Sequence, residues 1–146
     1  PLQELRAGDE VDFPGVTVRV RWPQPELVDG SPNNGSLVLD LEHAGLHALI
    51  TGDADAAAQQ AITLPLAGYA VFKVPHHGSR FQDPAFVHRV RPALALVSVG
   101  EGNDYGHPAK NTVQALRREG IPLLRTDEVG AIAVSVRKGQ LAFSSR

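Results

Sequence analysis

The chain has 146 residues, of which 42% are hydrophobic and 21% charged, a composition typical of one folded globular domain. These values exclude a disordered tail, a collagen-like chain and a coiled coil, and no apolar run reaches the ~18 residues of a membrane helix. The net charge of −2 is unevenly divided, since residues 1–68 carry −7 and residues 69–146 carry +5. The chain has no cysteine, which excludes disulfides and thiolate metal sites, and no methionine, so we expect it to be a piece of a longer protein.

The first half of the chain reads mainly as strands. Alternation of apolar and polar residues predicts strands over residues 16–22 and 36–42, separated by a loop with three prolines. Gly45 interrupts this pattern before a further strand over residues 47–50, so we expect the last two strands to form a hairpin. An alanine-rich stretch then predicts a helix over residues 54–64.

Strands and helices alternate in the second half. Apolar runs predict buried strands over residues 69–74 and 93–99. A helix follows each of them: the first starts at Asp83-Pro84, an acidic N-cap with a proline behind it, and the second covers residues 109–119 and ends at Gly120. The chain closes with short strands and their turns, namely residues 123–125, 131–137 and 140–144 with turns at Gly130 and Lys138-Gly139.

This order of elements predicts an α/β fold of the α+β kind, with a mixed sheet and flanking helices. The hairpins at the edge argue against a purely doubly wound sheet. We find no internal boundary or repeat, so residues 1–146 are expected to form part of a single domain.

Three polar clusters follow three of the predicted strands. They cover residues 51–55, 76–79 and 103–108. Because the carboxyl ends of strands joined by crossovers gather at one edge of a sheet, ligands bind there. Three clusters within 60 residues are more than turn composition requires, which makes this edge the candidate site.

Asp53 and Asp55 belong to the first cluster. Asp53 leaves its strand through a glycine turn, and a carboxylate can bridge two cations. The competing interpretation is that Asp53 caps the following helix. Asp55 fits a first-turn acid that favours the helix dipole, with a role behind the metal ligands as the alternative.

His76 and His77 form the core of the second cluster. Neutral imidazole is the commonest nitrogen ligand of divalent transition metals. Adjacent side chains do not usually share one face, so we expect one histidine to bind metal and the other to face substrate. A purely structural role for the pair is the alternative.

The third cluster contains Tyr105 and His107 in a loop framed by glycine and proline. His107 could bind a substrate phosphate or act as a general acid, and Tyr105 could donate a hydrogen bond or stack on a base. A packed turn without a function is the alternative. The remaining histidines, His43, His47 and His88, are expected to be solvated or at the rim.

Glycines 100, 102 and 106 weakly suggest a dinucleotide-binding loop. Their spacing is G-x-G-x-x-x-G, and His107-Pro108 intervenes before the next helix. The phosphate would therefore not lie on a nearby helix N-terminus, so this interpretation is disfavoured.

Taken together, five motifs in register resemble one family. They are N-N-x-S-L-V-L (33–39), L-I-T-G-D-A (49–54), K-V-P-H-H-G-S (73–79), S-V-G-x-x-N-x-Y-G-H-P (98–108) and R-T-D-x-x-G-A-I (125–132). The chain resembles the C-terminal metallo-β-lactamase-like domain of the ComEC competence proteins, the inner-membrane channels for DNA uptake in natural transformation. The resemblance covers nearly the whole chain.

The resemblance implies an αββα sandwich and a site for two divalent metal ions, Mn²⁺ or Zn²⁺, along one edge. It implies that Asp53 and His77 are metal ligands. His76, Asp55 and His107 would then serve the catalytic, substrate-facing side. The implied substrate-binding residues are Ser79 and Tyr105. Apart from the resemblance, the positive charge of the second half makes Lys73, Arg80 and Lys110 candidate phosphate contacts, with simple surface solvation as the alternative for each.

The family's H-x-H-x-D-H motif is absent from this chain, so the resemblance covers only the second half of the domain. Two ligands cannot hold a pair of metals, and we expect this fragment alone to be inactive. One sheet face would also be left uncovered. We expect the missing first half of the domain, a homo-oligomer or a swapped dimer to cover it.

For the intact domain, the resemblance implies metal-dependent phosphodiester hydrolysis of DNA. The expected substrate is single-stranded DNA, in particular the strand that the channel does not import. The +5 charge of the second half agrees with a backbone-binding cleft. The alternative is a degenerate domain that binds DNA or a partner without catalysis. The domain is expected on the extracytoplasmic side of the bacterial inner membrane.

Overall fold

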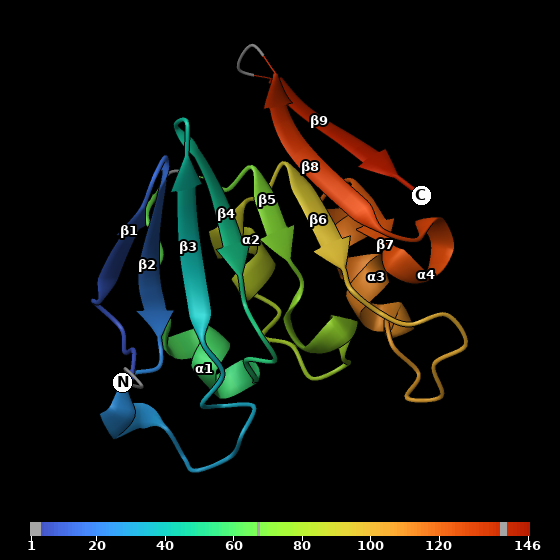
Figure 1. Cartoon of the computed structure of the whole chain (residues 1–146). Coiled ribbons are helices and arrows are strands. Elements are labelled where there is room, and N and C mark those ends of the chain that lie inside the picture. Colours follow the sequence, from blue (N-terminus) through green and yellow to red (C-terminus); the bar gives the residue numbers. More distant parts are fainter. Residues whose placement is uncertain (1–3, 67, 138–139) are drawn as a thin grey trace.

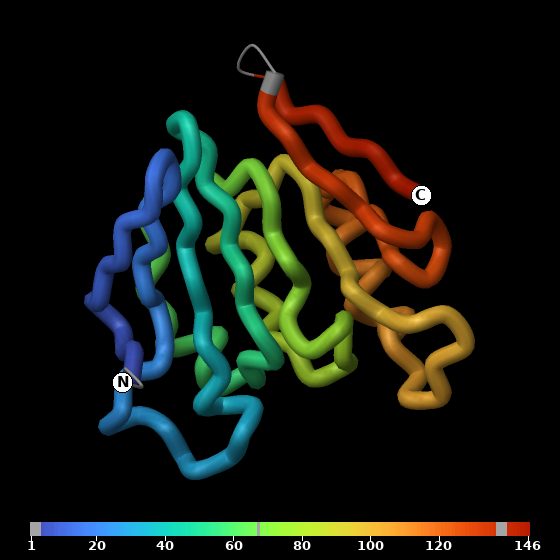
Figure 2. Tube along the Cα trace, in the orientation of Figure 1, coloured from blue at the N-terminus to red at the C-terminus, as the bar shows by residue number. Residues whose placement is uncertain are grey.

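The computed structural model describes residues 4–66, 68–137 and 140–146. Two sheets are present in this part of the chain (Figures 1 and 2). The seven-stranded sheet contains β1 (Glu10–Phe13), β2 (Val16–Trp22), β3 (Val38–His43), β4 (Leu46–Ile50), β5 (Val71–Lys73), β6 (Leu94–Val97) and β7 (Leu123–Arg125). The two-stranded sheet contains β8 (Ile132–Arg137) and β9 (Gln140–Ser145), and their predicted turn at Lys138-Gly139 lies outside the described residues.

The large sheet follows chain order from β1 to β7 and changes character at β4. Strands β1 to β4 pair antiparallel; short turns join β1 to β2 and β3 to β4, and a longer loop that contains residues 25–27 joins β2 to β3. Strands β4 to β7 pair parallel, because longer crossovers join them. The fold is therefore a mixed α/β structure with flanking helices, which confirms the predicted fold class.

Helices cover one face of the large sheet. In Figure 1, α1, α2 and α3 lie behind the strands, and α4 lies beside β7. Trp22, Leu49 and Phe72 point from the sheet into a core that these helices close with Phe86 and Leu116. The helical elements are α1 (Ala56–Ala61), α2 (Phe86–Val90), α3 (Lys110–Arg118), α4 (Thr126–Val129) and the 3₁₀ turns η1 (Pro25–Leu27) and η2 (Pro75–Gly78).

Two helices begin later than predicted. Helix α1 starts at Ala56 because the carboxylate of Asp55 caps it by accepting a hydrogen bond from Ala58 N at 2.9 Å. It ends at Ala61, three residues earlier than predicted, because Ile62 at the C-cap is already extended. Asp83 is not the cap of α2, since its carboxylate accepts from Ala85 N within a local turn and Ala85 occupies the N-cap position.

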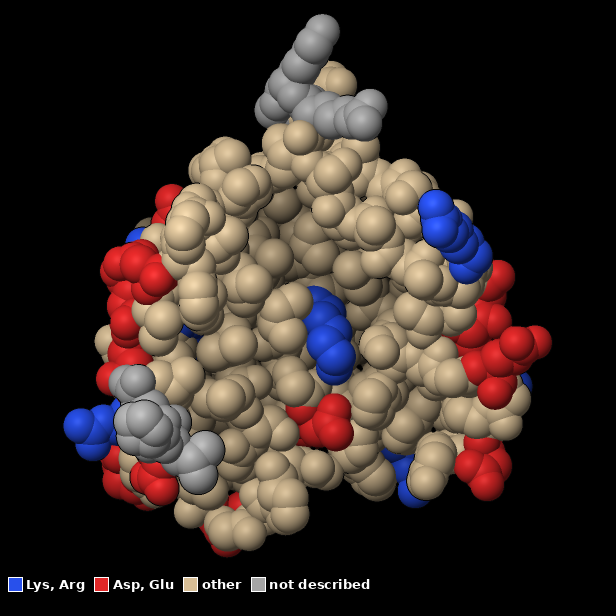
Figure 3. Space-filling view, viewed as in Figure 1, with Lys and Arg blue, Asp and Glu red and all other residues tan. Residues whose placement is uncertain are grey.

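The opposite face of the large sheet carries a second set of apolar side chains. Strand alternation places them opposite the core residues, and most are only half-buried. They include Val18, Leu39, Leu41, Ala48, Ile50, Leu96 and Leu124. Figure 3 looks onto this face and shows it hollowed in the centre, with most charged side chains at the margin. Within the described ranges, no helix is long and apolar enough to cross a membrane.

Candidate functional site

The loops that leave β4, β5 and β6 meet at one edge of the sheet. These three strands run parallel, so their carboxyl ends lie side by side. A cavity of about 500 Å³ lies between the loops. Its lining residues are Asp53, His76, His77, Val99, Gly100, Asn103, Tyr105 and His107.

Asp53 and His77 face each other across this cavity. His77 Nε2 lies 3.6 Å from Asp53 Oδ1, and both side chains are partly exposed. The other ring nitrogen of His77, Nδ1, lies 2.6 Å from the carbonyl oxygen of Ser98. A carbonyl only accepts, so Nδ1 carries a proton, and in the neutral ring the free lone pair belongs to Nε2, the nitrogen nearest Asp53. A backbone carbonyl that fixes the imidazole in this way is the usual arrangement behind a metal-binding histidine.

The two adjacent histidines diverge because the chain turns left-handed at both of them. His76 has φ of 47° and His77 has φ of 52°, and Gly78 continues with φ of 77°. Residues other than glycine pay a strain cost in this region, and such strain concentrates at functional sites. His76 N donates to the carbonyl of Gly52, which ties this turn to the loop that carries Asp53.

His76 faces the loop after β6. Its Nδ1 lies 3.4 Å from the side-chain amide nitrogen of Asn33, which can only donate. Nδ1 therefore accepts, and in the neutral ring the proton lies on Nε2. The ring of His76 meets the edge of His107, with the centroids 5.5 Å apart. The two neighbouring histidines thus carry their protons on opposite nitrogens.

His107 contains a buried polar atom, Nδ1, without a hydrogen-bond partner among the described residues. Burial and the neighbouring rings of His76 and His77 lower the pKa of His107 below its ordinary value. Gly78 supports this loop, because a side chain at position 78 would meet Pro108 at 2.7 Å. Ala109 N also donates to the carbonyl of Gly78 at 2.8 Å.

Two predicted site residues lie outside the cavity lining. Asp55 is the N-cap of α1 and also accepts from the side-chain amide of Asn34 at 3.1 Å. The predicted substrate-side role of Asp55 therefore gains no support from the geometry. Ser79 is 2% exposed, and its hydroxyl accepts from Phe81 N at 3.3 Å within the turn.

The predicted phosphate contacts Lys73 and Arg80 also do not line the cavity. Lys73 Nζ donates to the carbonyl oxygens of Gly52 at 2.9 Å and Val74 at 3.4 Å. Its burial lowers the pKa of this ammonium, an effect that the nearby Asp53 partly opposes. The guanidinium of Arg80 lies 4.9 Å from the centre of the exposed Phe81 ring.

Two asparagines have positioning roles that were not predicted from the sequence. Asn33 positions His76, and Asn103 both lines the cavity and closes its own loop. Asn103 Nδ2 donates to His107 O at 2.8 Å, while Asn103 Oδ1 accepts from His107 N at 3.2 Å. Both residues lie within the recognised motifs, but nothing in their local sequence distinguishes a positioning amide from a turn residue.

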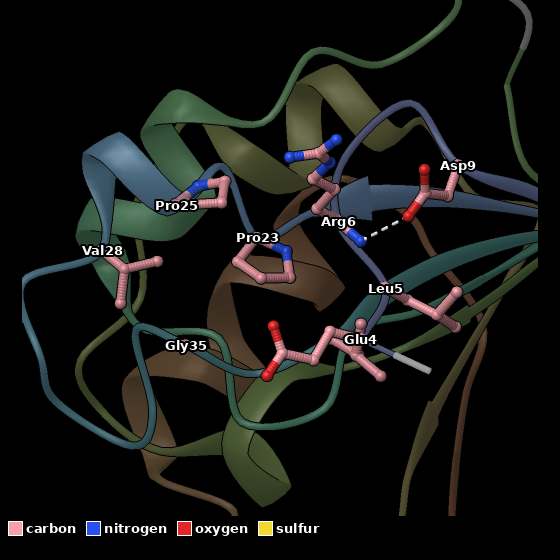
Figure 4. Close-up of a pocket in the computed structure, with 9 residues that line it drawn as sticks. Glu4, Leu5, Arg6, Asp9, Pro23, Pro25, Val28 and Gly35 are labelled. Atoms are coloured by element: carbon pink, nitrogen blue, oxygen red, sulfur yellow. Dashed lines mark hydrogen bonds between the residues drawn. The ribbon is translucent and has the colours of Figure 1, made fainter. Parts of the chain in front are cut away.

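A larger surface depression of about 920 Å³ lies beside the N-terminal segment (Figure 4). It is lined by Glu4, Leu5, Arg6, Asp9, Pro23, Pro25, Val28, Gly35 and Leu37. None of these is a predicted site residue. The backbone N–H of Arg6 donates to the carboxylate of Asp9 at 2.8 Å, so this acid already serves the local turn.

The donors at the histidine cavity meet only part of what a metal ion requires. A separation of 3.6 Å between His77 Nε2 and Asp53 Oδ1 suits two ligands of one ion, each at about 2.0–2.2 Å. A tetrahedral site needs about four donors, however. Within residues 4–66, 68–137 and 140–146 no group of three or more histidine, aspartate or glutamate side chains is placed to hold a metal. The described residues therefore offer two candidate donors and do not complete a metal site.

Comparison with known proteins finds relatives that are much longer. No family model matches the chain. ComE operon protein 3 of Bacillus subtilis is 35% identical over 98% of this chain and 19% of that protein. Competence protein ComA of Neisseria gonorrhoeae is 34% identical over 73% of this chain and 16% of that protein. Recombination protein 2 of Haemophilus influenzae is 26% identical over 92% of this chain and 17% of that protein. The chain thus spans less than a fifth of these relatives, and over most of its own length it is similar to one segment of ComEC-like competence proteins.

Proposed function

We propose that this chain is the second half of a metal-dependent phosphodiesterase domain that hydrolyses DNA within a DNA-uptake protein of the inner membrane. In the complete domain, two divalent ions such as Mn²⁺ or Zn²⁺ would activate water and neutralise phosphate charge. This chain would supply Asp53 and His77 as ligands. The remaining ligands would come from a part of the protein outside this chain.

The proposal rests on one observation, that the side chains of Asp53 and His77 face each other across the cavity. The two groups come from loops after different strands, yet their donor atoms are 3.6 Å apart. Neither donor is engaged in the way a structural ion pair usually is, since the separation exceeds a hydrogen bond and both side chains are partly exposed. The hydrogen bond from His77 to Ser98 leaves the free lone pair of the neutral ring on Nε2, the nitrogen nearest the carboxylate.

The neighbouring rings suit the substrate side of such a site. His76 accepts from Asn33 and therefore presents a neutral N–H at Nε2. His107 lies edge-on to His76 and lines the same cavity. Neutral N–H groups can donate hydrogen bonds to phosphoryl oxygens without competing with the metal donors for the ions.

The uncovered apolar face of the large sheet supports the proposal that this chain is only part of a domain. Leu39, Leu41 and Ile50 remain half-buried on a face without helices. Apolar sheet faces are normally packed against a second layer. The layer that we propose is the first half of the domain, which would bring the missing metal ligands to the same edge.

The test uses the full-length natural protein that carries this chain. Cleavage of a DNA oligonucleotide is measured with Mn²⁺, with Zn²⁺ and with chelator. Asp53→Ala and His77→Ala are each expected to reduce cleavage at least a hundredfold and to lower the amount of bound metal. His88→Ala, which changes an exposed histidine paired with Glu119, is the matched control and should retain cleavage. Cleavage at the natural rate in either site variant would contradict the proposal.

A second candidate function is binding of DNA or a partner without catalysis. It is favoured by the absence of a third metal donor near Asp53 and His77 in the described part of the chain. The same experiment separates the two functions. A full-length protein that binds DNA, holds no metal and shows no cleavage would support binding alone.

A further inference from the structure

We infer that the ring of Tyr105 is a stacking surface for one unpaired nucleobase beside the Asp53–His77 pair. This inference rests on the proposed phosphodiesterase function and adds to it a group that contacts the base. It assigns the site a substrate whose bases are unpaired next to the scissile bond.

Tyr105 is unusually exposed for an aromatic residue that lines a cavity. Its side chain is 83% exposed, the second highest value among the large exposed hydrophobic residues. Tyrosine is normally at least half-buried, because its ring contributes a large apolar area. An exposed ring at the mouth of this cavity therefore offers apolar surface to a ligand.

The ring is oriented for stacking. It lies 28° from parallel to the ring of His107, with the centroids 6.4 Å apart. His107 in turn meets His76, so one continuous row of rings runs from the mouth of the cavity to its histidines. A flat base placed on Tyr105 would extend this row, and its phosphate would lie toward Asp53 and His77.

The loop holds Tyr105 in place although its side chain is exposed. Asn103 bonds to both the N–H and the carbonyl of His107, and so closes the loop around Tyr105. Gly78 packs against Pro108 at the far end of the same loop. A loop backbone that is fixed before binding loses little conformational entropy when a ligand binds to it.

The geometry favours an unpaired base over a duplex. In a duplex both faces of a base are covered by its neighbours, so stacking on a protein ring requires the base to leave the stack. Base–aromatic stacking tolerates every base, because each has a π face. The cavity of about 500 Å³ has room for one nucleotide.

The test compares two single-stranded oligonucleotides in the full-length natural protein, one with ordinary bases and one with abasic residues at the same backbone positions. The natural protein is expected to cleave the ordinary oligonucleotide faster. Tyr105→Ala is expected to reduce this preference about fivefold or more. Tyr105→Phe should keep the preference, because stacking needs the ring and not the hydroxyl. Phe13→Ala, which removes an exposed ring on β1 at the opposite edge of the sheet, is the matched control and should also keep it.

Equilibrium binding of the same oligonucleotides separates the two proposals. If the natural protein cleaves neither oligonucleotide, the proposed function fails, and the stacking inference is then judged from binding of the ordinary oligonucleotide relative to the abasic one. A preference that Tyr105→Ala does not reduce would overturn the inference, as would an equal loss in Tyr105→Phe. The first result would mean that another part of the protein covers the ring, and the second that the hydroxyl is the binding group.

Discussion

Two aspartate–histidine pairs in this molecule differ in burial and in the distance between their side chains. Asp40 and His47 lie in the antiparallel half of the sheet, with His47 Nδ1 at 2.9 Å from Asp40 Oδ1. Asp53 and His77 lie at the end of the parallel half, 3.6 Å apart. The side chain of Asp40 is fully buried, whereas that of Asp53 is 39% exposed. The same two residue types therefore serve the interior in one region and an open cavity in the other.

The partners of each carboxylate explain the difference. Asp40 also accepts from the guanidinium of Arg21 and from the hydroxyl of Tyr69 at 3.3 Å. Burial raises the pKa of Asp40, but the hydrogen bonds and charges of Arg21 and His47 outweigh it, so the carboxyl remains charged. Burial and the nearby Asp40 carboxylate raise the pKa of Tyr69, which keeps its hydroxyl protonated and able to donate. Asp40 is thus saturated with donors, whereas Asp53 retains free acceptor capacity for a ligand.

The largest expected effect is on stability at Asp40. Asp40→Asn removes the buried charge that pairs with Arg21, whose side chain is 26% exposed, and is expected to lower the free energy of unfolding by about 3 kcal/mol. Asp53→Asn is the matched change in the other pair and should alter it by less than about 0.5 kcal/mol. Urea denaturation of both variants measures the difference. Equal destabilisation by the two changes would show that Asp53 is also a structural carboxylate.

A smaller effect is expected at Gly78, which joins the two histidine-bearing loops. Gly78→Ala introduces a methyl group that meets Pro108 at 2.7 Å in a left-handed backbone position. The expected loss is about 1–3 kcal/mol of unfolding free energy, with displacement of the loop that carries Tyr105. Gly102→Ala is the control, because φ is 67° there but no atom lies within 4 Å, so only the backbone strain of about 1 kcal/mol remains. Equal losses in the two variants would exclude a specific contact between the loops.

The pH dependence of stability offers a third, more gradual distinction. The pKa of Asp40 in the folded state lies below its ordinary value of 3.8, so the unfolded chain binds the proton more readily. The contribution of Asp40 is therefore complete above that value and is lost as the pH falls through the lowered pKa. In Asp40→Asn, the free energy of unfolding should fall less steeply with decreasing pH on the acid side than it does in the natural chain. An unchanged slope on the acid side would assign the loss to other carboxylates.

The regular part of the fold was accessible from sequence. Alternation predicted β2 and most of β3, and the limits of β7 were predicted correctly, because strand patterning depends on local polarity and turn residues. Helix α3 also lies within its predicted range, since Gly120 ends it with φ of 70°. Strand β1 was missed because four residues carry too little alternation, and α4 was missed because its four residues form a single turn.

The site was less accessible, because long-range contacts decide its details. The left-handed turn at His76 and His77 opposes their local preference and is held by the hydrogen bond from His76 N to Gly52 O. The expectation that His47 is solvated was wrong for the same reason, since Asp40 is recruited from the neighbouring strand. The residue types alone could predict which edge of the sheet carries the candidate site. They could not tell which carboxylate is saturated and which is free.

The smallest expected effect concerns which ring nitrogen carries the proton in the neutral forms of His76 and His77. Asn33→Ala removes the donor to His76 Nδ1 and should leave the unfolding free energy within about 0.5 kcal/mol of the natural value. Nitrogen-15 NMR of the neutral rings should then show His76 losing its preference for a proton on Nε2. His77 is the internal control in the same spectrum, since Ser98 O continues to hold its proton on Nδ1. Asn33→Asp sharpens the comparison further: a carboxylate can only accept, so the proton of His76 should move to Nδ1. If neither substitution changes the tautomer of His76, the side-chain amide of Asn33 does not position this ring. The different proton positions in His76 and His77 would then have to come from the backbone turn alone.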